Sequence, residues 1–138
     1  RALSHEIAHL VTHQMTSNPY NSIPVWLNEG ISMYAEGELE KDYENYLKAA
    51  VINGSLISVR SLCSPFSAYS DKSYLSYAES YSIVAFLIEK YGQQKIHQLL
   101  TVFKTGSTYD NALLEVYGFD LAGLNRQWQN YITGIYIS

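Results

Sequence analysis

Cysteine is nearly absent from this chain. Cys63 is the only one among 138 residues, so no disulfide can form within the chain, and we expect its thiol to be a small buried apolar group. Basic residues are also few, and the net charge of −4 argues against a nucleic-acid-binding surface. No apolar run reaches the roughly 20 residues of a membrane-spanning helix, so we expect no membrane contact within these residues.

The remaining composition is that of a globular protein, with 47% hydrophobic and 16% charged residues. The length suits one compact domain covering residues 1–138. Tyrosine is abundant, with 13 copies against 9 Lys and Arg, which favours an extracytoplasmic setting. The chain opens with Arg1 and a histidine motif follows within four residues, so we expect it to be a piece of a longer protein.

Helical periodicity runs through most of the chain, and no segment shows the strict alternation of a strand. The stretch 55–73 lacks a period and is predicted as a long loop with one helical turn near 60–64. The segment 73–92 is apolar around much of its circumference and should be central. The sequence therefore predicts an all-α chain of about seven helices. These cover residues 1–15, 24–36, 40–54, 73–92, 93–106, 107–118 and 120–132.

The first predicted helix contains the motif "HEIAH". His5 and His9 are four residues apart, so on a helix their rings stand on one face and can reach a single zinc ion. Glu6 is rotated by about 100° from His5, where it can contact a water beside the metal without binding the metal itself. His13 lies about 12 Å along the axis from His5, too far to share the ion.

Catalytic zinc needs a third protein ligand and an open fourth position. Glu29 stands in "WLNEG" among apolar residues, and a carboxylate in such company is either exposed or paired with a cation. A short turn over residues 17–23 would fold its helix back onto the first one. The sequence thus predicts a zinc site made by His5, His9 and Glu29, while the preceding Asn28 could support the ligand or simply face solvent.

These two motifs, with 19 residues between His9 and Glu29, resemble those of the gluzincin metallopeptidases. That group includes aminopeptidase N-like enzymes and peptidase MA-like domains. The spacing is one residue longer than is usual in aminopeptidase N-like enzymes, and the turn over 17–23 can accommodate the extra residue. The segments "YAESYSIVAFLIEKYG" and "YDNALLEVYGFDLAGLNRQW" resemble the helices that follow in this family, so the likeness covers most of the chain.

The resemblance implies zinc-dependent hydrolysis of peptide bonds in a peptide or protein substrate, with Glu6 as general base. It also implies that Tyr77, at the start of "YAES", stabilises the oxyanion; Tyr81, one turn later, is the rival. The chain would be the helical catalytic part of the fold, without the small β-sheet that precedes it in gluzincins.

The alternative is a non-catalytic module derived from a peptidase, which binds zinc or peptide without cleaving. The presence of both histidines, Glu6 and Glu29 argues against a degenerate site. A closed structural zinc site would need a fourth side-chain ligand, and Cys63 is the only thiol.

Overall fold

The computed structural model describes residues 23–67 and 70–137, with the side chains of Ser70 and Asp71 left aside. This part is all-helical, and no strand occurs within the described ranges. It contains six α-helices and one short 3₁₀ helix. They are α2 (Val25–Glu36), α3 (Lys41–Asn53), η1 (Ser61–Cys63), α4 (Ser70–Tyr91), α5 (Gln93–Lys104), α6 (Tyr109–Tyr117) and α7 (Leu121–Tyr136). The first predicted helix, over 1–15, lies outside the described residues.

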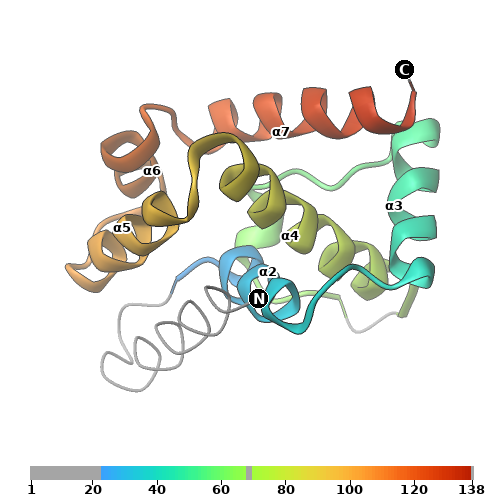
Figure 1. Ribbon diagram of the computed structural model, residues 1–138, viewed down its shortest axis with the longest axis horizontal. Coiled ribbons are helices and arrows are strands. Elements are labelled where there is room, and N and C mark those ends of the chain that lie inside the picture. Colours follow the sequence, from blue (N-terminus) through green and yellow to red (C-terminus); the bar gives the residue numbers. More distant parts are fainter. Residues whose placement is uncertain (1–22, 68–69, 138) are drawn as a thin grey trace.

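Helix α4 forms the centre of the arrangement, as predicted (Figure 1). It contacts α2, α3, α5 and α7, and α2 packs against it most extensively. Ile83, Val84 and Leu87 are completely buried on α4. An α-helix that is apolar on several sides must be covered on several sides, which explains why four helices surround this one.

The ends of two helices differ from the predicted ones by three or more residues. Helix α4 begins at Ser70, three residues before the predicted start. The sequence did not indicate this first turn because its residues are polar and carry no apolar period. Helix α7 continues to Tyr136, four residues beyond the predicted end. Gly134 lies inside it, and the half-buried Tyr136 packs against the core, so tertiary contact outweighs the local breaking tendency of glycine.

Other ends match their sequence signals. Gly54 follows α3 in the left-handed conformation, at φ 67°, which glycine adopts without a steric penalty. The Asp120 carboxylate accepts a hydrogen bond of 2.9 Å from the Gly123 N–H and so caps α7, as predicted. The helical turn expected near 60–64 is η1.

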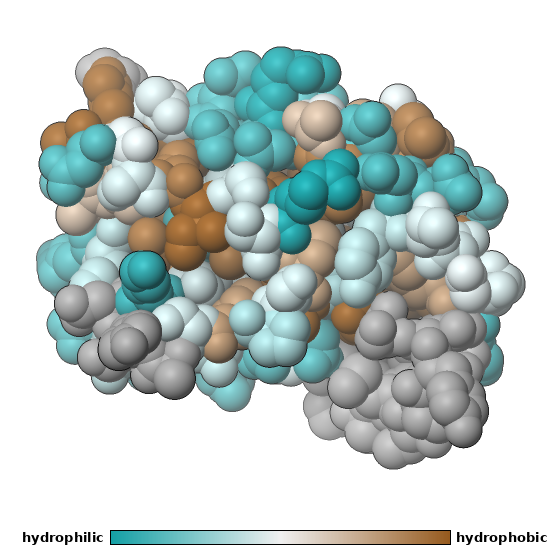
Figure 2. Space-filling model, turned by 180° about the vertical axis from the view of Figure 1, so that it is seen from behind, coloured by the Kyte–Doolittle hydropathy of each residue, from teal (hydrophilic) through white to brown (hydrophobic). Residues whose placement is uncertain are grey.

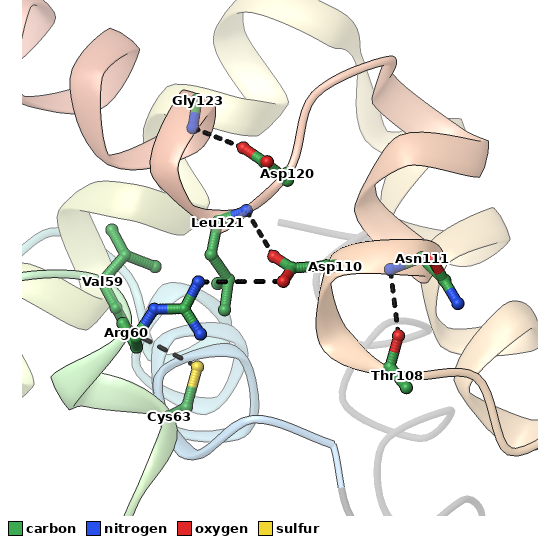
Figure 3. Close-up of polar contacts among 9 residues, drawn as sticks. All are labelled: Val59, Arg60, Cys63, Thr108, Asp110, Asn111, Asp120, Leu121 and Gly123. Carbon is green, nitrogen blue, oxygen red and sulfur yellow. Dashed lines mark hydrogen bonds and ion pairs between the residues drawn. The ribbon is translucent and has the colours of Figure 1, made fainter.

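The segment between α3 and α4 is fastened to the helices that it crosses. The Val59 N–H donates to Asn125 Oδ1 on α7 at 3.0 Å. Arg60 forms an ion pair of 3.7 Å with Asp110 on α6, and the other Asp110 oxygen accepts from the Leu121 N–H at 2.9 Å (Figure 3). These contacts join elements far apart in the sequence.

Cys63 lies on η1 with its thiol close to the Val59 carbonyl oxygen, at 3.5 Å (Figure 3). Only 7% of the residue is exposed, which confirms the prediction of a buried cysteine. Burial raises the pKa of this thiol to about 11, while the Trp26 indole and Arg60 act in the opposite direction. A thiol with so high a pKa stays protonated at neutral pH and is a poor metal ligand.

The face shown in Figure 2 is largely hydrophilic, with apolar patches in brown. One of them is at the C-terminal end of α7, where Ile135 and Ile137 are about half exposed. Within the described ranges, every helix is too short or too polar to cross a bilayer.

Candidate active site

Helices α2 and α4 are in close backbone contact at Gly30. A Cβ atom added to Gly30 would collide with the Ser80 carbonyl oxygen and would lie 2.6 Å from Val84 Cγ2. The glycine that weakens α2 as a helix is therefore required by packing, because only a residue without a side chain allows the backbones this close. The same turn of α2 carries Glu29, so this contact fixes its position relative to α4.

Glu29 is the one predicted zinc ligand that belongs to the described residues. Its side chain is half-buried, whereas Trp26 and Leu27 on the preceding turn are fully buried. Burial raises the pKa of the Glu29 carboxyl above its ordinary value. No hydrogen bond or ion pair joins this carboxylate to another described residue. A partly desolvated carboxylate without a partner is a group that a bound cation would stabilise.

The other predicted site residues on the first helix, His5, Glu6 and His9, lie outside the described residues, as does His13. Within the described ranges, no group of three or more His, Cys, Asp and Glu side chains converges as a metal site would require. The zinc site therefore stays a prediction, and Glu29 fits it by its burial and its lack of a described partner.

Tyr77 and Tyr81 stand one turn apart on α4, and both are half-buried. The Tyr77 ring meets the Phe66 ring edge-on at 5.2 Å between centroids. The Tyr81 ring lies 5.9 Å from that of Tyr34 on α2. Both tyrosines line one hollow of about 360 Å³ together with Met33 of α2. Since they share this hollow, the predicted preference for Tyr77 over Tyr81 stays a prediction.

A buried carboxyl that the sequence did not reveal belongs to Glu79, two residues from each tyrosine along α4 and on a different face of the helix. Glu79 is completely buried, and its Oε2 atom accepts a hydrogen bond of 2.9 Å from the Ile57 N–H. Its Oε1 atom has no hydrogen-bond partner in the described part. Burial raises the pKa of Glu79 to about 8, against the opposing effect of the Ile57 N–H. At neutral pH Glu79 is therefore mostly a neutral acid that holds the loop against α4.

The sequence also did not single out the glutamates around the hollow. Glu36, Glu38 and Glu40 line it together with Tyr43 of α3. The available signal was the run "EGELE", in which Glu38 and Glu40 follow Glu36, the last residue of α2, at intervals of two residues. Their meeting with Tyr77 required knowledge of how α2, α3 and α4 pack.

A family model described as Peptidase MA superfamily matches residues 1–134 of this chain. No curated protein and no solved structure matches it. The matched range contains both "HEIAH" and "WLNEG", as well as all described helices through most of α7.

Proposed function

Because the chain belongs to the peptidase MA superfamily, we propose that it is the helical part of a zinc-dependent peptidase. The observation that carries the proposal is the Glu29 carboxylate. It stands half-buried, with a raised pKa and no described partner, on the turn of α2 that packs on α4. The proposed zinc ligands are His5, His9 and Glu29. When bound, the zinc ion would supply a Lewis acid that polarises the scissile carbonyl and makes a water molecule more acidic.

The proposed chemistry on the protein side is a proton transfer by Glu6. Its carboxylate accepts a proton from the attacking water and delivers it to the amine that leaves when the peptide bond breaks. The proton balance closes, because the leaving nitrogen gains what the water lost.

The second role belongs to a tyrosine hydroxyl. As the carbonyl carbon becomes tetrahedral, its oxygen gains negative charge, which an O–H donor stabilises more than it stabilises the planar substrate. Tyr77 is the proposed donor. Support comes from its place on the wall of the hollow that also reaches α2.

The test is Glu6→Gln in the intact protein, assayed with a library of quenched fluorescent peptides. The amide cannot accept the proton, so we expect turnover to fall by about 10²–10⁴-fold while zinc content is unchanged. Glu115→Gln, on the exposed face of α6, is the matched control and should retain full activity. Near-normal turnover of a zinc-loaded Glu6→Gln protein would refute the role of Glu6. Zinc binding without cleavage by the wild type would instead support a non-catalytic module.

A further inference from the structure

The hollow beside Tyr77 is lined mainly by acidic and aromatic side chains. Three carboxylates, from Glu36, Glu38 and Glu40, and the hydroxyphenyl groups of Tyr43, Tyr77 and Tyr81 line it. Its volume of about 360 Å³ falls within the range of roughly 300–1,000 Å³ that is typical of ligand pockets.

Its position relates it to the proposed site. Met33 and Glu36 line the hollow and follow Glu29 on α2 by four and seven residues, which is the spacing of one helix face. They lie about 6 and 10 Å further along the helix axis. An extended peptide advances about 3.3–3.6 Å per residue. A peptide that is cleaved beside Glu29 and runs along α2 would therefore place a side chain two or three residues from the cleaved bond at the hollow.

The carboxylates of the hollow are exposed and share a segment. Glu38 and Glu40 alternate with Leu39, which packs against the core, so the two glutamates emerge on the side away from it. No ion pair joins either of them, or Glu36, to a lysine or arginine in the described part of the chain. Their charge is therefore available to a ligand.

The tyrosines add a second attraction for positive charge. An ammonium or guanidinium group over an aromatic face is attracted by the electrons of the ring. Tyr43 lies within the field of the carboxylates. Burial, Tyr74, and then Glu40, Tyr77 and Glu36 raise the pKa of its hydroxyl. Glu36 and Glu40 thus both act electrostatically on Tyr43, as expected for residues that line the same hollow.

We propose that this hollow is a specificity subsite that binds a lysine or arginine side chain of the peptide substrate. The inference rests on the proposed peptidase function. The carboxylates attract the cationic head, the tyrosine rings flank it, and Met33 and Leu39 contact the aliphatic stem. An acidic side chain would be repelled, and a neutral apolar one would have to strip water from three carboxylates without compensation.

The experiment measures binding apart from cleavage. The Glu6→Gln background of the intact protein is titrated with paired peptides that carry lysine or norleucine at successive positions, and fluorescence anisotropy reports the dissociation constant. At low ionic strength we expect at least one lysine peptide to bind about tenfold more tightly than its norleucine partner, and this preference to weaken in high salt.

Substitutions of the glutamates show whether they cause the preference for lysine peptides. Glu38→Gln should reduce it, and the triple variant Glu36→Gln, Glu38→Gln, Glu40→Gln should abolish it, while Glu115→Gln leaves it intact. Circular dichroism checks that each variant is folded. The absence of any lysine preference, including no binding of either peptide, overturns the subsite, as does an equal loss in Glu115→Gln.

Wild-type turnover separates the two proposals. Cleavage of lysine and norleucine peptides at equal rates, with equal binding, leaves the peptidase function standing and removes the subsite. A lysine preference that depends on these glutamates, in a protein that cleaves nothing, leaves the cationic subsite standing and removes hydrolysis.

Discussion

At the scale of single residues, the proposed oxyanion donor gives a direct comparison. Tyr77→Phe removes one hydroxyl and keeps the ring that contacts Phe66, so folding should lose at most about 1–2 kcal/mol. Turnover should fall by about 10²-fold with little change in substrate binding, because the hydroxyl acts mainly in the transition state. Steady-state kinetics of the intact protein measures both quantities.

Tyr81→Phe is the matched control, since it removes the same group from the same face of α4. If Tyr81→Phe reduces turnover and Tyr77→Phe does not, the donor is Tyr81. If neither substitution matters, no tyrosine of this hollow stabilises the oxyanion.

Glu79 makes a prediction about stability and pH. Its pKa is about 8 in the folded protein, against an ordinary value of 4.5, so the folded state binds the extra proton between these values. The contribution of Glu79 to the free energy of unfolding is therefore fully present below about pH 4.5. It is lost as the pH rises toward 8, by up to about 1.4 kcal/mol per pH unit. Glu79→Gln can still accept from the Ile57 N–H but cannot ionise.

We therefore expect Glu79→Gln to be at least as stable as the wild type near pH 8, with the difference shrinking toward pH 5. Urea unfolding at a series of pH values measures this. A difference that stays constant across that range would contradict the raised pKa.

At the scale of the helices, the contact between α2 and α4 is the feature most exposed to test. Gly30→Ala should destabilise the protein by about 1–3 kcal/mol, because the new methyl group would collide with Ser80 and Val84. Gly134→Ala is the control, since nothing lies within 4 Å of its Cβ position on α7. That substitution should be neutral or stabilising by up to about 1 kcal/mol. Equal effects of the two changes would contradict the close approach.

Helices could be predicted from the sequence where apolar period and end signals agree. Gly54 and the cap of Asp120 mark their ends correctly, because each acts through the backbone of its own neighbours. The prediction failed at the last turn of α7, where packing of Tyr136 against the core extends the helix beyond the predicted end at residue 132. Such contacts with distant residues leave no local pattern.

At the scale of the whole molecule, contacts between residues distant in sequence also limit how much of the site the sequence predicts. Two short motifs predict the metal ligands, because metal geometry restricts which residue spacings can work. The hollow could not be predicted, since it depends on α2, α3 and α4 meeting around Tyr77. Glu79 was also missed, because its hydrogen-bond donor, the Ile57 N–H, belongs to a loop that is distant in sequence.

The central claim is that Glu29 shares one zinc ion with His5 and His9. A crystal structure of the intact protein grown with zinc, with anomalous data collected on both sides of the zinc absorption edge, tests it most directly. We expect one anomalous peak with His5, His9 and Glu29 atoms about 2.0–2.2 Å from it. A structure that places His5 and Glu29 more than about 8 Å apart would contradict the claim, because no single ion could bridge them.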